Sequence, residues 1–318
     1  MRAVRHTEHG IEVVDVEASD VDVSDVDGSD AVAVRVRSSG ICGSDLHLLA
    51  WGPSPITLGH EVAGTLPDGT PVALWPSMPC GVCDRCSIGQ VAQCRTGLAA
   101  GYGVGRDGGM AESMLVAKRN LIALPDGLRV EDGALVEPMA CAVHALRRVG
   151  VGRDDRVAIV GGGAIGLCAA AAAHSLDAAV DVEARHPAQR AAAQQFGVGV
   201  EASGEYDVIV DAAGTSSAMR RCLDLLRPGG TIAVVATHWS PVELPAFFTS
   251  KEPTFIAATG HGRLDEVHDM DVAARVLADR PEVAAAIITH RLPLDQAAVA
   301  FALAADRAAG AIKVVLEP

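Results

Sequence analysis

The stretch that decides the fold is RVAIVGGGAIGLCAAAAA, residues 156–173. It predicts a buried apolar strand, a glycine-rich turn and an alanine-rich helix, in that order. Glycines in the pattern GxGxxG allow a tight turn there, and they let a pyrophosphate approach the backbone N–H groups that begin the helix. We therefore expect a bound dinucleotide, held by Gly161, Gly163, Ala164, Ile165 and Gly166.

The end of the next expected strand, residues 180–190, decides which dinucleotide binds. Ala184 stands where a carboxylate would hold the ribose hydroxyls of NAD, and Arg185 and Arg190 bring positive charge that suits the 2′-phosphate of NADP. A register shift of one residue would put Glu183 at the NAD-type position. We predict NADP(H) and keep NAD(H) as the alternative.

Two kinds of pattern surround this segment. YDVIVDAAG and GGTIAVVATH are further buried strands with helices between them, so strand–helix alternation predicts a doubly wound parallel sheet. Residues 1–118 instead carry short valine-rich strands broken by Gly, Pro and Asp, which predicts a mostly β region. A helix begins near Glu137 and ends at Gly150. After residue 270, two helices alternate with the expected strands AAIITHRL and AIKVVLEP.

Composition limits the classes of function. The 318 residues are 49% hydrophobic, enough for two domains with cores, and their 26 basic and 40 acidic residues give a net charge of −14, which disfavours nucleic acid as a partner. We find no apolar run long enough to cross a membrane and no apolar block of a signal peptide, so we expect a cytoplasmic protein. The acidic segment 15–30 lacks the register of an EF-hand, and we interpret it as a solvated loop and not a calcium site.

Four cysteines in PCGVCDRCSIGQVAQC, residues 79–94, predict a metal site. In a chain without an export signal, eight cysteines favour metal ligation over a disulfide framework. A redox CxxC pair would not explain four cysteines at this spacing. Four thiolates complete the tetrahedral shell of a structural zinc ion. The predicted ligands are Cys80, Cys83, Cys86 and Cys94.

A second group of metal-binding residues precedes this lobe. Cys42 in SSGICGSDLHLLA and His60 and Glu61 in ITLGHEVAG come from separate loops, which is typical of a catalytic zinc site with one position open to substrate. Each residue alone is a weak signal, since single cysteines and histidines are common in protein cores. Beside a second zinc motif, we interpret them together as a catalytic site.

These motifs, in this order along essentially the whole chain, resemble the zinc-dependent medium-chain dehydrogenase/reductase superfamily of alcohol and polyol dehydrogenases. The resemblance implies an α/β protein with a GroES-like, mostly β catalytic domain at residues 1–141 and 271–318, including a structural zinc lobe at about 80–94. It implies a Rossmann coenzyme domain at residues 142–270. It further implies one catalytic and one structural zinc ion, NADP or NAD, a small alcohol or carbonyl substrate, and a homo-oligomer.

The resemblance also implies a further zinc ligand from GALVEPMACAVHAL. Polyol, sugar and threonine dehydrogenases use the Glu of a Glu-Pro pair, here Glu137, whereas simple alcohol dehydrogenases have a Cys about four positions later, here Cys141. We favour Glu137 and keep Cys141 as the alternative, and Glu61 stays open as a direct ligand or a partner of one.

A proton relay is expected next to Cys42. The hydroxyl of Ser44 can take the proton of the substrate alcohol, and His47, a side chain that exchanges protons near neutral pH, can pass it to water through the coenzyme ribose. We thus predict an enzyme that moves a hydride between an alcohol, polyol or sugar-type hydroxyl and NAD(P). The alternatives are a zinc-free quinone or enone reductase of the same superfamily and a non-catalytic zinc-binding scaffold.

Overall fold

The structure is a computed structural model that describes residues 1–16, 30–264, 266–306 and 308–318. Most of the acidic segment expected to be a solvated loop therefore lies outside the described residues. No helix in those ranges is long and apolar enough to cross a membrane. The chain forms two compact units: Met1–Glu137, Gly262–Ala284 and Ile288–Pro318, and Pro138–His261 with Ala285–Ile287.

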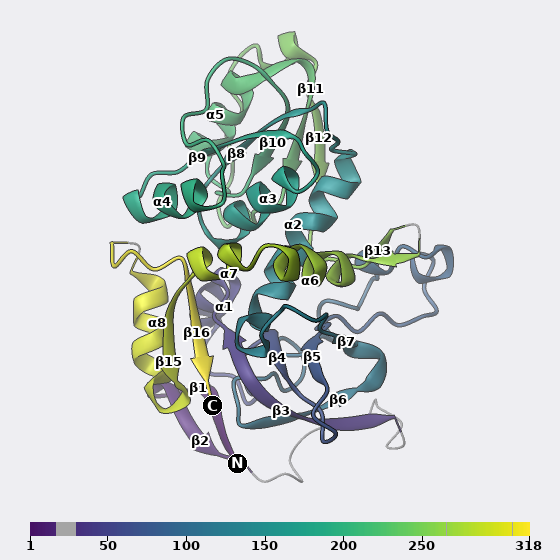
Figure 1. The fold of residues 1–318 in the computed structure, drawn as a ribbon, viewed down its shortest axis with the longest axis vertical. Coiled ribbons are helices and arrows are strands. Elements are labelled where there is room, and N and C mark those ends of the chain that lie inside the picture. Colours follow the sequence, from purple (N-terminus) through teal and green to yellow (C-terminus); the bar gives the residue numbers. More distant parts are fainter. Residues whose placement is uncertain (17–29, 265, 307) are drawn as a thin grey trace. The chain divides into compact units, whose positions relative to one another are not determined.

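The first unit contains a seven-stranded sheet in the order β15-β16-β3-β4-β5-β7, with β6 also paired to β3 (Figure 1). β15 and β16 run parallel, and the other pairs run antiparallel. The strands are β3 (Ala31–Gly40), β4 (Glu61–Thr65), β5 (Pro71–Leu74), β6 (Ser113–Ala117), β7 (Leu121–Ala123), β15 (Ile288–Pro293) and β16 (Lys313–Glu317). Two small sheets pair β1 (Arg2–Thr7) with β2 (Gly10–Asp15) and β13 (Arg263–Leu264) with β14 (Val267–His268).

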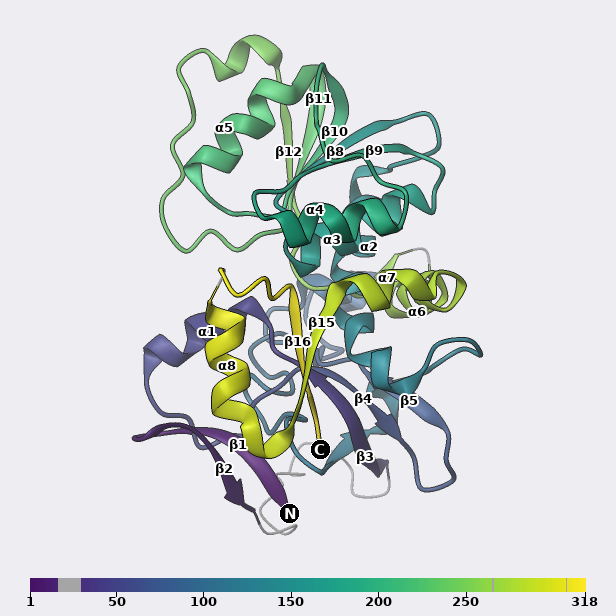
Figure 2. The same ribbon diagram turned by 60° about the vertical axis from the view of Figure 1, so that its left-hand side comes forward.

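Helices and 3-10 turns complete this unit. They are α1 (Gly43–Leu48), α6 (Asp269–Asp279), α8 (Ala297–Ala305), η2 (Leu49–Trp51), η3 (Cys86–Ile88), η4 (Val91–Gln93), η5 (Lys118–Asn120), η6 (Val130–Leu135) and η8 (Leu294–Gln296). Alternate residues of β3, such as Val34 and Val36, point into a core shared with β4, β5 and β6. A second core lies beneath α8, which contacts β15 and β16 (Figure 2).

The second unit contains a five-stranded, all-parallel sheet in the order β12-β11-β10-β8-β9. The strands are β8 (Arg156–Val160), β9 (Ala179–Glu183), β10 (Tyr206–Asp211), β11 (Leu226–Val234) and β12 (Thr254–Ala257), and α3 (Ala164–His174), α4 (Pro187–Gln195), α5 (Ser216–Leu225) and η7 (Phe248–Lys251) connect them. This confirms the predicted doubly wound parallel sheet. Helix α2 (Val136–Val149) starts at the predicted place, with Pro138 in its first turn.

One predicted element differs from the structure. We expected a strand across residues 285–292, but helix α7 (Pro281–Ile287) occupies its first part and β15 begins only at Ile288. The reason is local: Pro281 stands at the first helical position, and the alanines that follow favour a helix.

Candidate active site

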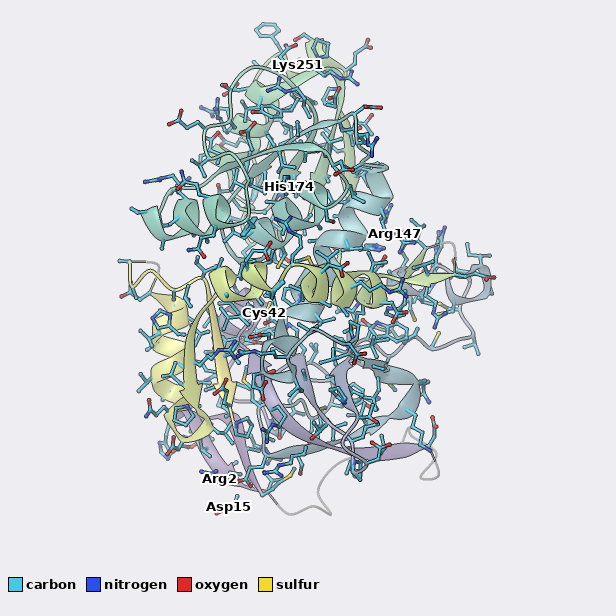
Figure 3. All side chains as sticks on the ribbon, viewed as in Figure 1. Arg2, Asp15, Cys42, Arg147, His174 and Lys251 are labelled. Carbon is cyan, nitrogen blue, oxygen red and sulfur yellow. The ribbon has the colours of Figure 1, made fainter. Side chains whose placement is uncertain are left out.

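Cys42, His60 and Glu61 come together in the first unit, at one end of β3 and β4. β3 ends at Gly40 shortly before Cys42 (labelled in Figure 3), and Glu61 begins the antiparallel partner β4, paired with Gly40. One ligand atom of each of the three residues lies within 4.8 Å of the others. His60 and Glu61 are buried, and Cys42 is partly exposed. A thiolate, an imidazole and a carboxylate in this arrangement fit a zinc ion with an open position.

A buried carboxylate that we did not predict, Asp45, supports two members of this group. Its Oδ2 accepts a hydrogen bond of 2.9 Å from the N–H of Cys42, and its Oδ1 lies 3.3 Å from Nδ1 of His60. Nε2 of His60 is therefore the nitrogen left for a metal. Burial acts to lower the pKa of His60, but the charge and hydrogen bonding of Asp45 and of Cys42 together outweigh it and raise the pKa well above 6.5. The signal was present in the sequence, because Asp45 is the last residue of CGSD.

Glu61 also has a partner that the sequence did not predict, the buried Lys313 at the start of β16. Nζ of Lys313 lies 2.6 Å from both carboxylate oxygens of Glu61 and donates a further bond of 3.0 Å to the carbonyl of Ile41. Burial raises the pKa of Glu61, against the lowering effect of Lys313. Gly40 makes room for this pair, since a Cβ there would lie 2.1 Å from Oε2 of Glu61.

Glu137 and Cys141, the two alternatives for the further zinc ligand, lie one turn apart on α2. Their ligand atoms are within 4.8 Å of each other, and within the second unit Cys141 lies equally close to His261. The charge of Glu137 raises the pKa of Glu61. Among the described residues, however, the group formed by Cys42 and His60 includes Glu61 and not Glu137. Glu137 as a ligand stays a prediction.

The predicted relay residues both lie on α1. Ser44 is partly exposed in the first turn, two residues after Cys42. Nδ1 of His47 is 2.8 Å from the carbonyl oxygen of Gly43, so Nδ1 carries the hydrogen and Nε2 is the nitrogen that can accept a proton. Trp51, which follows at the end of η2, is 78% exposed.

The four predicted thiols of the lobe converge. One Sγ from each of the four cysteines lies within 4.8 Å of the others, and 3-10 turns η3 and η4 fold the intervening chain. Burial acts to raise the pKa of Cys94, but the N–H groups of Cys80 and Thr96 lower it to about 6, so this thiol ionises readily. Val82 and Ile88 on the lobe are exposed, so apolar burial contributes little there. The donor set fits a structural zinc ion.

The glycine-rich turn has the geometry that a pyrophosphate needs. Gly161 has φ of +117° directly after β8, and a Cβ on Gly166 would lie 1.8 Å from the carbonyl oxygen of Gly161. Gly163 precedes the first residue of α3, where no side chain caps the N–H groups, and a Cβ on Gly163 would meet nothing within 4 Å. The turn therefore leaves open space in front of the N-terminus of α3, formed by Ala164, Ile165 and Gly166.

The residues at the end of β9 are the ones expected to distinguish NADP from NAD. The carboxylate of Glu183 accepts a 2.6 Å hydrogen bond from Arg221, so its negative charge is already balanced by an arginine. Ala184 offers only a methyl group. The exposed Arg185 donates to Ser217, whereas Arg190 is bound to the carbonyls of Ala184 and Arg185 and so supports the loop.

Comparisons with known proteins show which family the chain is similar to. Residues 28–126 match the family described as alcohol dehydrogenase GroES-like domain, and residues 182–316 match the family described as zinc-binding dehydrogenase. The chain is 30% identical over 293 residues to L-galactonate-5-dehydrogenase of Escherichia coli, covering 82% of this chain and 84% of that protein. It is 30% identical over 303 residues to galactitol 1-phosphate 5-dehydrogenase of Escherichia coli, covering 82% and 85%.

Solved structures show the same likeness over the whole chain. The crystal structure of galactitol-1-phosphate dehydrogenase from Escherichia coli superposes with a TM-score of 0.87 at 28% identity, covering 100% of both chains. A zinc-binding dehydrogenase from Sinorhizobium meliloti 1021, solved bound to NADP, gives a TM-score of 0.83 at 28% identity, covering 100% of this chain and 99% of that one. The chain therefore belongs to the zinc-dependent medium-chain dehydrogenase/reductase superfamily, as a zinc-dependent, NAD(P)-dependent alcohol or polyol dehydrogenase.

Proposed function

We propose that this protein oxidises a secondary hydroxyl of an open-chain polyol or sugar acid, or reduces the matching ketone, with NADP(H) as its coenzyme. The observation that carries the proposal is the group of Cys42, His60 and Glu61, whose ligand atoms lie within 4.8 Å of one another. The choice of substrate is supported by the relatives named above, two of which are named for dehydrogenation at carbon 5 of a six-carbon sugar acid or polyol phosphate.

In this proposal each residue of the first unit has a defined task. Cys42 and His60 hold the metal together with Glu61 or Glu137, and Asp45 orients His60. When bound, zinc polarises the oxygen of the substrate and the nicotinamide exchanges the hydride. Ser44 takes the hydroxyl proton at Oγ, and His47 receives it at Nε2. Cys80, Cys83, Cys86 and Cys94 hold the structural zinc ion.

A substrate panel tests the choice of substrate. We expect kcat/KM on hexitols, pentitols, aldonates and their phosphates to exceed that on unbranched primary alkanols by about a hundredfold or more, because a site that hydrogen-bonds neighbouring hydroxyls rejects substrates without them. Initial rates with both coenzymes measure this. Higher kcat/KM on primary alkanols would contradict the proposal, and zinc-independent reduction of quinones or enones would favour the zinc-free alternative.

The preference for NADP(H) rests on Arg185. Removing its charge in Arg185→Ala should weaken NADPH binding about tenfold and leave NADH binding unchanged, because a charge-assisted hydrogen bond to the 2′-phosphate is lost. Coenzyme fluorescence titration measures both dissociation constants. Arg153→Ala is the matched control, since Arg153 is paired with Asp177 and is largely exposed. Equal weakening of both coenzymes in Arg185→Ala would refute this assignment.

We further propose that the first unit is the catalytic domain, that the second is the coenzyme domain, and that the protein works in the cytoplasm as a homo-oligomer. All eight cysteines lie in the described ranges and none of them forms a disulfide, which suits a reducing compartment. β12 is the strand at one end of the second sheet. Its Phe255 is 39% exposed, and Phe247, just before η7, is 85% exposed. We expect light scattering to show an oligomer that dissociates in the variant Phe255→Asp, and a monomeric wild type would contradict this.

A further inference from the structure

Asp211 and His238 form a hydrogen-bonded pair in the second unit that has no role in the proposed mechanism. Asp211, the last residue of β10, is 0% exposed, and its Oδ1 accepts hydrogen bonds of 3.0 Å from the N–H groups of Ala213 and Gly214. Its Oδ2 lies 2.9 Å from Nε2 of His238, in the segment after β11. The carboxylate is thus fixed on both oxygens.

This pair sets which nitrogen of His238 carries the hydrogen. A carboxylate only accepts, so Nε2 of the imidazole donates, and in the neutral ring Nδ1 is left with a lone pair. The side chain of His238 is 25% exposed, and within the described ranges its hydrogen bond to Asp211 is the one it makes. His238 therefore presents a hydrogen-bond acceptor of fixed orientation.

The pair stands where the second half of a dinucleotide is expected. In a doubly wound sheet the ligand lies outside the carboxyl ends of the strands, with one nucleotide over each half of the sheet. We expect the glycine turn and the end of β9 to bind the adenosine half of the coenzyme. The carboxyl ends of β10 and β11 are then the expected binding place of the nicotinamide half. The loop after Asp211 adjoins the glycine turn: Ala212 donates to the carbonyl of Val160, and a Cβ on Gly161 would lie 2.9 Å from the backbone of Ala212.

The loop that carries His238 packs on the loop that follows Asp211. A Cβ on Gly214 would lie 2.8 Å from the carbonyl oxygen of Thr237 and 3.2 Å from Cδ2 of His238. The carbonyl of Asp211 also accepts from the N–H groups of Val235 and Ala236. Asp211 thus connects the loop after β10 with the loop after β11 at the carboxyl edge of the sheet, and it holds the imidazole of His238 there.

We propose that His238 binds the nicotinamide nucleoside of the coenzyme, with Nδ1 accepting a hydrogen bond from its carboxamide N–H or its ribose O–H. Asp211 is the positioning residue that fixes the required tautomer. The inference rests on the coenzyme class, NAD(P), and not on the proposed preference for NADP or on the substrate.

Binding measurements without turnover test this. In His238→Phe a ring of similar size keeps its place, but the acceptor at Nδ1 and the donor to Asp211 are both gone. We expect the dissociation constant of the preferred reduced coenzyme to rise about fivefold, the effect of one hydrogen bond, while that of ADP, or of 2′,5′-ADP if NADPH is preferred, changes less than about twofold. Asp211→Asn should weaken the full coenzyme similarly by reversing the tautomer of His238, and the double variant should add little.

Each other outcome overturns the proposal. Unchanged coenzyme binding in His238→Phe means that the histidine does not contact the coenzyme. Equal weakening of the ADP fragment means that the pair only supports the glycine turn, and a normal coenzyme affinity in Asp211→Asn removes its positioning role. The matching ADP-ribose, which keeps the ribose and lacks the ring, separates the two donors: weakening there assigns the ribose hydroxyl, and no weakening assigns the carboxamide.

Discussion

The variant Cys42→Ser is expected to lose one of about two zinc ions per chain and to lower kcat/KM by about a thousandfold or more. A serine hydroxyl does not ionise near neutral pH, so the metal keeps only His60 and a carboxylate as protein ligands. The fold should survive, because Cys42 stands at the N-cap of α1, where serine is a favoured residue. Metal analysis of the purified variant, together with initial rates, measures both effects.

Cys94→Ser is the matched control for this experiment. It removes a thiol from the other metal group, so it should also lose one zinc ion, but its main effect should be a lower melting temperature. The lobe depends on the metal for its stability because Val82 and Ile88 are exposed on it. If Cys42→Ser retained both zinc ions and its activity, Cys42 would not be a ligand of the catalytic metal.

Local patterns predicted the parts of the site whose residues are close together in sequence. The four cysteines lie within 15 consecutive residues, and the glycine turn lies between an apolar strand and an alanine-rich helix, so spacing alone identifies both. Asp45 could have been predicted in the same way, since it follows Cys42 by three residues. The pattern CGSD predicts a ligand at Cys42 and a relay at Ser44, and its remaining polar residue, Asp45, lies 3.3 Å from His60 in the structure.

Lys313 could not be predicted from any local pattern. It is 252 positions from Glu61, and the two meet because β16 pairs with β3 next to the start of β4. A lysine opening a valine-rich strand predicts an exposed strand end, and only the strand order shows that it is buried. The pairing of Glu183 with Arg221 is similar, since it depends on how α5 packs in the second unit.

Removing Lys313 is expected to have the largest effect on stability of the substitutions considered. Lys313→Met keeps most of the apolar stem but leaves the carboxylate of Glu61 buried without its partner, and it leaves the carbonyl of Ile41 without its donor. Breaking a buried ion pair from one side costs about 3–5 kcal/mol. Urea unfolding should show this loss as a lower midpoint. The surface pair of Arg153 and Asp177 provides the comparison, since Arg153→Met should cost less than about 1 kcal/mol.

A double variant separates the charge effect from the packing effect. Glu61→Gln/Lys313→Met removes both charges, so no ion is left buried alone, and we expect it to recover most of the stability that Lys313→Met loses. Catalysis should not recover, because Glu61 belongs to the group of side chains that could hold a metal together with Cys42 and His60. If the double variant were as unstable as Lys313→Met, the loss would come from the packing of Lys313 and not from the unpaired carboxylate. Stability restored without activity, the expected result, would mean that Lys313 stabilises the fold by balancing the buried charge of Glu61, and that the carboxylate itself is needed for catalysis.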